Sequence, residues 1–249
     1  MANETGRIGW SNNIITGLEE NPLMENVFGK FNKAFLVGVI GEEFKLNYIV
    51  KDEKFYRTLV KVERFSGTED IIPVIVPEKI IEQEMGDEVI GKWAAFCGQF
   101  RSYNKTDENG KTHLELFLFT KRVDICKSED GVKKSLIKLL NGDNFVNNLV
   151  FIDGYLCKKR ELRTTPSGIK ICDLIIAVNR SCGKTDYIPC ITWEKVAEWT
   201  QNLEVGSHVK AYGRIQKRDY YKKSSENPKR GKWKIAYELS VIRIKKLKK

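Results

Sequence analysis

Residues Arg163–Trp199 read RTTPSGIKICDLIIAVNRSCGKTDYIPCITWEKVAEW, and turn, strand and helix signals follow one another along them. The turn is TPSG, Thr165–Gly168, in which proline presets φ at one central position and glycine accepts positive φ. Two runs rich in Ile, Val, Leu and Tyr flank the turn, Leu149–Lys158 and Ile169–Arg180. Because β-branched and aromatic residues favour strands, the stretch predicts a β-hairpin.

Signals on either side of this hairpin complete a small barrel. Gly154 lies within the first strand, where a glycine permits the bulge that a closing barrel requires. A third strand is predicted at Tyr187–Trp193 and a short helix at Glu194–Leu203, followed by strands at Ser207–Arg218 and Trp233–Lys245. Five strands with a helix between the third and the fourth predict an OB-fold, a Greek-key barrel that mainly binds oligonucleotides and oligosaccharides.

Six short motifs occur in order between Asn148 and Leu247, namely ELRTTPSG, IIAVNR, DYIPCITWEKVAE, a turn at Gly206, GRIQKRDY and a closing ELSVIRI strand. Together they resemble the bacterial single-stranded-DNA-binding protein family. The resemblance implies sequence-tolerant binding and protection of single-stranded DNA in replication, recombination and repair.

The same pattern occurs a second time, earlier in the chain. Four residues recur at a constant offset of 116 and two glycines at an offset of 115: Asn32, Gly38, Arg64 and Pro73 recur as Asn148, Gly154, Arg180 and Pro189, and Gly91 and Gly98 as Gly206 and Gly213. We therefore predict a mainly β protein with two tandem OB-fold barrels. The predicted divisions are an N-terminal arm of undecided structure at 1–31, a first barrel at 32–125, a linker or short helix at 126–147 and a second barrel at 148–249.

Charge is distributed unevenly along the chain. The net charge is +10 overall, +13 for residues 148–249 and −2 for residues 32–125. A polyanionic partner is therefore expected at the second barrel. Six cysteines at no metal-ligand spacing and only two histidines predict neither a metal site nor a histidine-based triad. With no Gly-rich phosphate loop either, we predict no cofactor and no enzymatic activity.

The chain also lacks the marks of a secreted or membrane protein. No N-terminal apolar run resembles a signal peptide, and no stretch approaches the length of a membrane span. We expect a cytoplasmic protein without membrane contact, acting at the nucleoid or at sites of phage or plasmid replication.

Aromatic side chains are the candidates for base stacking. The family resemblance implies stacking by Tyr187, Trp193 and Tyr220, and Tyr221 beside the last is a further candidate. A fourth family stacking position holds Cys182. The first barrel has Ile71, Pro77 and Lys105 at the positions of the three aromatics. Since each stacked base contributes about 1–3 kcal/mol, the first barrel is expected to be a weak binder or a structural partner.

Cations near these aromatics are the candidates for contacts with the DNA backbone. The loop Asp219–Lys232 combines cations with tyrosines at a position that flanks the OB-fold binding face. The corresponding loop of the first barrel contains the carboxylates Asp107 and Glu108, which would repel phosphates. The predicted backbone contacts are Arg163, Arg180, Lys195, Arg214, Lys217, Arg218, Lys222, Lys223, Lys229 and Arg230, with Arg101, Tyr103 and Lys105 as weak contacts of the first barrel. Trp199 and Trp233 are expected to be core residues, and Arg180 could equally be a strand-end charge.

Alternatives remain open for assembly, partner and ligand. The family resemblance implies a homodimer presenting four barrels, and the alternative is a monomer whose two barrels form a pseudo-dimer. The chain ends in basic IKKLKK, not in the acidic tip by which family members recruit replication proteins. The alternative function is an interaction module of a primosome-type assembly with secondary nucleic-acid affinity. RNA is an alternative ligand, because stacking and a basic groove do not by themselves distinguish a 2′-hydroxyl.

Overall fold

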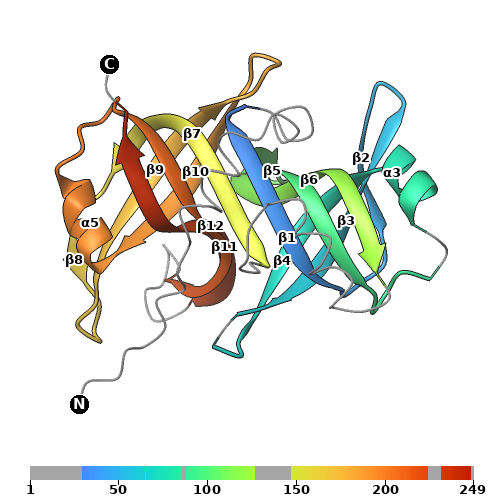
Figure 1. The fold of residues 1–249 in the computed structure, drawn as a ribbon, viewed down its shortest axis with the longest axis horizontal. Coiled ribbons are helices and arrows are strands. Elements are labelled where there is room, and N and C mark those ends of the chain that lie inside the picture. The colour runs from blue at the N-terminus through green and yellow to red at the C-terminus, as the bar shows by residue number, and fades with distance from the viewer. Residues whose placement is uncertain (1–29, 65, 86–87, 127–146, 224–230, 248–249) are drawn as a thin grey trace.

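The computed structural model describes residues 30–247 with the exception of 65, 86–87, 127–146 and 224–230. All but the two end residues of the predicted linker, nearly all of the predicted N-terminal arm, and Lys229 and Arg230 lie outside the described residues. The described chain forms two β-barrels side by side (Figure 1).

The first barrel contains β1 (Asn32–Ile40), β2 (Lys45–Val50), β3 (Glu53–Glu63), β4 (Glu69–Pro77), α3 (Glu78–Glu84), β5 (Trp93–Thr106) and β6 (Thr112–Cys126). The second contains β7 (Asn148–Lys159), β8 (Arg163–Thr164), β9 (Lys170–Asn179), β10 (Thr185–Trp193), α5 (Glu194–Gln201), β11 (His208–Lys223) and β12 (Gly231–Lys246). In each barrel the first strand pairs with two neighbours, and a parallel pair, β4–β6 or β10–β12, closes the ring. The predicted tandem OB-fold is confirmed.

The repeat predicted from spacing is also visible in matching contacts. The side-chain amide of Asn32 donates to the Phe100 carbonyl and accepts from its N–H, and Asn148 does the same with Ile215. A Cβ at Gly154 would lie 2.3 Å from the Ala177 carbonyl oxygen, so only glycine lets the first strand of the barrel bend so closely over its neighbour.

The two barrels are joined by their first strands. β1 pairs with β7 in antiparallel register, and Ala34 lies opposite Val150, its own counterpart at the offset of 116. A local two-fold axis therefore passes through the β1–β7 strand pair and relates the two strands, as in an isologous dimer. The intrachain pseudo-dimer that was one of the two predicted arrangements is present, while the homodimer remains a prediction.

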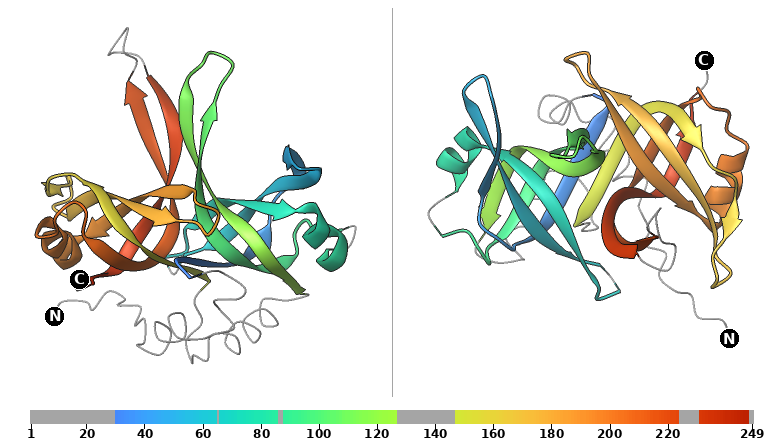
Figure 2. Two further views of the ribbon diagram at one scale, coloured as in Figure 1. Left: turned by 90° about the horizontal axis from the view of Figure 1, so that it is seen from above. Right: turned by 180° about the vertical axis from the view of Figure 1, so that it is seen from behind.

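Two long hairpins project from the same side of the molecule (Figure 2). We call their outer parts the first arm, residues 103–115 of β5–β6, and the second arm, residues 218–236 of β11–β12. The prediction of a loop from Asp219 to Lys232 was wrong at both ends, since β11 continues to Lys223 and β12 begins at Gly231. Cross-strand aromatic pairs such as Tyr221 and Trp233 stabilise such a ladder beyond the barrel. Within the described ranges, no helix is long and apolar enough to cross a membrane.

Candidate nucleic-acid interface

β10 carries two of the predicted stacking residues on one face of the second barrel. Tyr187 is 48% exposed near the start of the strand. Trp193 is half-buried at its end, where its indole N–H donates to Ser240 Oγ at 3.1 Å. This bond fixes the ring orientation, so Trp193 presents one defined aromatic surface.

The second arm carries the other aromatics on its two faces. Tyr220 is half-buried, with the guanidinium of Arg218 5.7 Å from its ring centre. On the opposite face, Tyr221 packs edge-on against Trp233 at a centroid distance of 5.6 Å. The expectation that Trp233 and Trp199 are core residues was wrong, because they are 74% and 41% exposed. Trp233 lies where the hairpin has left the barrel, and Trp199 lies on the outer side of α5.

A cleft of about 680 Å³ opens between the bases of the two arms. Both barrels line it, and Pro73 and Pro189, which are counterparts in the repeat, lie in its wall. Tyr220 is its aromatic from the second arm, and its cations include Arg57, Lys105, Arg218 and Lys234. An elongated anion with flat groups fits a cleft of this composition.

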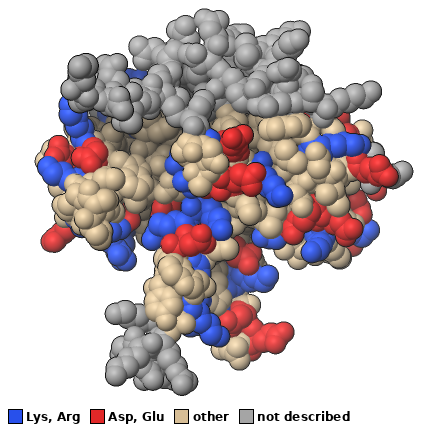
Figure 3. Space-filling view, turned by 90° about the horizontal axis from the view of Figure 1, so that it is seen from below, with Lys and Arg blue, Asp and Glu red and all other residues tan. Residues whose placement is uncertain are grey.

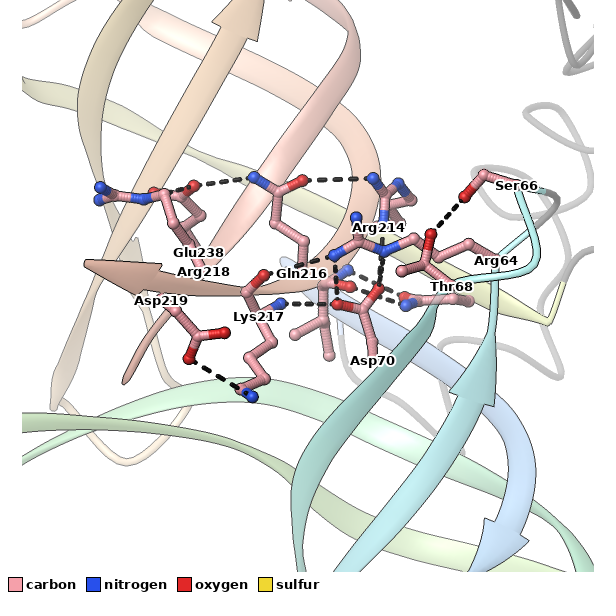
Figure 4. A network of polar contacts seen from close by, with 12 residues as sticks. Arg64, Ser66, Thr68, Asp70, Arg214, Gln216, Lys217, Arg218, Asp219 and Glu238 are labelled. Atoms are coloured by element: carbon pink, nitrogen blue, oxygen red, sulfur yellow. Dashed lines mark hydrogen bonds and ion pairs between the residues drawn. The ribbon is translucent and has the colours of Figure 1, made fainter. Parts of the chain in front are cut away.

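A buried carboxylate in the first barrel holds the second barrel in place. Asp70 is 1% exposed and accepts from Arg64 Nε at 2.7 Å, from Arg214 Nη1 at 3.1 Å and from the Lys217 N–H at 2.8 Å (Figure 4). Arg64 also donates to the Lys217 carbonyl. Both backbone groups of one β11 residue are therefore held by β4 and its preceding turn. We call this set of residues the Asp70 junction.

The repeat produces an equivalent set of contacts in which a buried aspartate of the second barrel binds a strand of the first barrel. Asp186 is 1% exposed, accepts from Arg180 Nε at 2.7 Å and from the Ser102 N–H at 2.7 Å, while Arg180 donates to the Ser102 carbonyl at 3.0 Å. The Tyr187 N–H donates to Ser102 Oγ at 2.9 Å. We call this set the Asp186 junction. It places Tyr187, a predicted stacking residue, directly at the boundary between the barrels.

These contacts change the roles of two predicted backbone-binding cations. Arg180 pairs with Asp186 of its own hairpin, and Arg214 pairs with Asp70 of the other barrel, so both guanidinium groups contact buried carboxylates between the barrels. The hydrogen bond to Asp186 raises the pKa of Arg180, whereas burial lowers the pKa of Arg214. We therefore assign both arginines to the junctions rather than to the DNA backbone.

The remaining predicted cations fall into two groups. Paired with carboxylates are Arg163 with Asp173, Lys217 with Asp219 and Arg218 with Glu238. Lys195 is exposed on α5, and the side chains of Lys222 and Lys223 are outside the described set. The surface at the base of the projecting hairpins accordingly shows basic and acidic side chains intermixed (Figure 3).

The first barrel has an aromatic cluster that the sequence comparison missed. Tyr48 stacks on Phe55 at a centroid distance of 4.8 Å, and Phe55 lies 5.8 Å from Phe119. Phe119 lies opposite Gln99 as Ser240 lies opposite Arg214, so it occupies the position of the residue that Trp193 contacts in the second barrel. Phe119 lies on the last strand of its barrel, outside the family's stacking positions, so the sequence signal for it is the alignment of the two last strands.

The first arm holds the other weak contacts that were predicted. Tyr103 is 58% exposed, and Lys105 forms an ion pair with Glu115 at 3.6 Å. Asp107 accepts from the N–H groups of Asn109 and Lys111 and contacts His113 Nε2 at 3.0 Å. These bonds, led by that from Lys111, lower the pKa of Asp107. Its carboxylate therefore holds the turn of the arm, a role that the expectation of phosphate repulsion did not include.

The second half of the chain matches a known protein family. Residues 147–242 match the model of the Single-strand binding protein family. The second barrel is therefore similar to this family. The matched region contains the second-barrel members of the Asp186 junction, the four predicted stacking aromatics and nearly all of the second barrel.

Individual relatives agree with the family assignment. The chain is 39% identical over 80 residues to single-stranded DNA-binding protein 3 of Listeria innocua, covering 29% of this chain and 50% of the relative. It is also 39% identical over 80 residues to single-stranded DNA-binding protein A of Bacillus subtilis, covering 29% and 46%. The chain thus spans about half the length of the curated relatives it matches.

A solved structure shares the fold of both halves. The crystal structure of the single-stranded DNA binding protein from Thermus aquaticus superposes with a TM-score of 0.62 over 88% of this chain and 93% of that one, at 18% identity. The shared architecture therefore extends beyond the region that the family model matches, to the paired barrels as a unit.

Proposed function

We propose that this protein binds single-stranded DNA without reading its sequence and protects it during replication, recombination or repair, as a binding protein and not as an enzyme. The observation that carries the proposal is the second barrel itself. It matches the model of the Single-strand binding protein family and carries Tyr187, Trp193 and Tyr220 in a part of the chain with a net charge of +13. The relatives from Listeria innocua and Bacillus subtilis are single-stranded DNA-binding proteins, which agrees with this ligand.

The proposed mechanism combines stacking with charge. Bases stack on Tyr187 and Trp193, and the strand continues along the cleft, where Tyr220 provides the third aromatic surface. Every base has a flat π-face, so this mode is tolerant of sequence. Arg218 and Lys234 line the cleft along this route and supply positive charge for the phosphates.

The test removes two stacking surfaces together. We expect Trp193→Ala combined with Tyr220→Ala to weaken binding of oligo(dT) by about 2–6 kcal/mol at constant salt, because each stacked base contributes about 1–3 kcal/mol. Trp199→Ala is the matched control, since Trp199 is also partly exposed but lies on α5 away from the proposed route. Circular dichroism checks that each variant is folded. Unchanged affinity in the double variant would leave an interaction module as the better description.

The nature of the nucleic acid is tested separately. Oligo(dT) and oligo(U) of equal length compete for the wild-type protein in one titration. We expect oligo(dT) to be preferred, and equal competition would extend the proposal to RNA, because stacking alone does not detect a 2′-hydroxyl.

A further inference from the structure

Arg101 on β5 is a partly buried cation without a carboxylate partner in the described part of the chain. Its guanidinium lies 3.8 Å from the centre of the Phe119 ring. Nε and Nη2 both donate to Gln99 Oε1, at 3.0 and 2.7 Å, so its hydrogen bonds go to a neutral amide. Burial and the nearby Arg180 lower the pKa of Arg101 to about 10. Buried charges are normally paired, so an unneutralised arginine at this depth indicates a site for an anion.

Other groups around Arg101 have the same character. Burial lowers the pKa of Lys121, and Arg101 lowers it further, which shows that the two cations lie within electrostatic reach. Burial raises the pKa of Tyr48 against the opposing influence of Arg101 and Arg180. Three cations therefore share this region with one buried carboxylate, that of Asp186, which Arg180 already occupies.

The counterpart of Arg101 in the repeat shows that this excess of charge is not imposed by the fold. At the offset of 115, Arg101 corresponds to Gln216 and Gln99 corresponds to Arg214, so the arginine and the glutamine have exchanged places. Arg214 binds Asp70, and Gln216 donates to Glu238 at 2.8 Å. The Asp70 junction thus pairs its arginine internally, whereas the Asp186 junction leaves Arg101 available.

The location of Arg101 identifies the anion. Its neighbour Ser102 is bonded to Asp186 and to the Tyr187 N–H, so the β5 backbone at Arg101 runs beside the part of β10 that carries the second barrel's exposed tyrosine. Tyr48 and Phe119 provide aromatic surface on the first-barrel side. A phosphate flanked by bases matches this alternation of cation and ring.

We propose that the Asp186 junction is a crossing point at which a single strand passes from the second barrel to the first. A backbone phosphate binds Arg101 together with Lys121. The base on one side of it lies on Tyr187, and the base on the other side reaches Tyr48. The proposal rests on the proposed function, and it makes the first barrel a specific participant in binding.

The test compares a short with a long oligonucleotide. Oligo(dT) of about 10 nucleotides fits one OB-fold, and one of about 35 nucleotides must extend over both. Arg101→Gln is expected to weaken binding of the long strand about tenfold, as for one charged hydrogen-bonded contact, and to reduce its log–log salt slope by about 0.7. Binding of the short strand is expected to stay within twofold of wild type.

Arg122→Gln is the matched control. Arg122 is an exposed arginine on β6 of the same barrel, paired with Asp124 at 3.0 Å, and its loss changes the net charge equally. Arg101→Lys keeps the positive charge but lacks the planar guanidinium group, so this variant should have the salt slope of the wild type. If Arg101→Gln behaves like Arg122→Gln on the long strand, the crossing point is overturned while the proposed function stands. If the wild-type protein binds neither strand, the proposed function itself fails.

Discussion

The two junctions between the barrels are built from the same parts and differ in one exchange. Each has a buried aspartate that holds an arginine from its own barrel and the backbone of a strand from the other. Asp70 also receives Arg214, whereas Asp186 receives the Ser102 side chain instead. The common part fixes the relative orientation of the barrels. The positions that differ determine whether the arginine of a junction pairs with a carboxylate inside the protein or stays available to a ligand.

The two arms differ in the same sense. Tyr221 and Trp233 face each other across the second arm, and the corresponding pair in the first arm is Thr106 and Thr112. The aromatic surface of the first barrel has moved inward, to Tyr48 and Phe119 beside the junction. A duplicated barrel can therefore keep its architecture while the positions that contact a ligand are redistributed.

The largest effect is expected from the carboxylates. Asp70→Asn should lower the free energy of unfolding by about 3 kcal/mol, because it leaves two partly buried arginines, Arg64 and Arg214, without a charged partner. Asp186→Asn leaves one arginine, Arg180, without a charged partner and should lower the free energy of unfolding by about 2 kcal/mol. Urea denaturation of the full chain measures both. A greater loss for Asp186→Asn would contradict the difference drawn between the junctions.

A charge-conserving exchange would convert one junction into the other. The double variant Gln99→Arg with Arg101→Gln gives the Asp186 junction the arrangement of the Asp70 junction. We expect the introduced guanidinium to pair with Asp186 and the affinity for a long oligo(dT) to fall about tenfold, as for a lost charged contact. Since the net charge is unchanged, this loss cannot come from overall electrostatics. Retained affinity in a titration at fixed salt would show that position 101 is unimportant.

The second arm offers a smaller test. Trp233→Ala should weaken oligo(dT) binding by about 1 kcal/mol if the exposed ring stacks on a base. Its effect on unfolding should be slight, because the side chain is 74% exposed. Thr112→Ala at the matching position of the first arm serves as the control. Equal affinities for the two variants would remove Trp233, and the face of the second arm that carries it, from the binding route.

The smallest effect concerns the turn of the first arm. The pKa of Asp107 is lowered from 3.8, chiefly by the Lys111 N–H. A carboxyl whose pKa is lower in the folded state contributes stability above its unfolded value, and this contribution is lost as the pH falls through the lowered value. An NMR titration should show Asp107 ionising below its usual range in the folded chain, and Asp107→Asn should abolish the pH dependence of the turn. An ordinary titration would contradict the bonded turn.

The sequence by itself determined the two barrels, their strand order and the repeat that relates them. Alternating apolar residues, the TPSG turn and the recurring Asn32 and Gly38 act within a strand or between neighbouring strands, so their meaning can be read locally. The same local reasoning placed Tyr187 and Trp193 on one strand. Local reasoning predicted that the strand ends at Arg218, which is too early, because the ladder from Tyr220 outward is stabilised by residue pairs across the hairpin.

Only the tertiary structure decided which charges are available. Arg214 and Asp70 are 144 residues apart, and nothing local to either indicates that they meet. Their contact depends on the pairing of β1 with β7, which sets one barrel against the other and brings Arg214 to Asp70. Arg101 resembles Arg180 and Arg214 in the sequence, yet the folded arrangement leaves it facing an aromatic ring and a neutral amide. Charge depends on residue type, but whether that charge is neutralised depends on which distant groups the fold brings within a few ångströms of it.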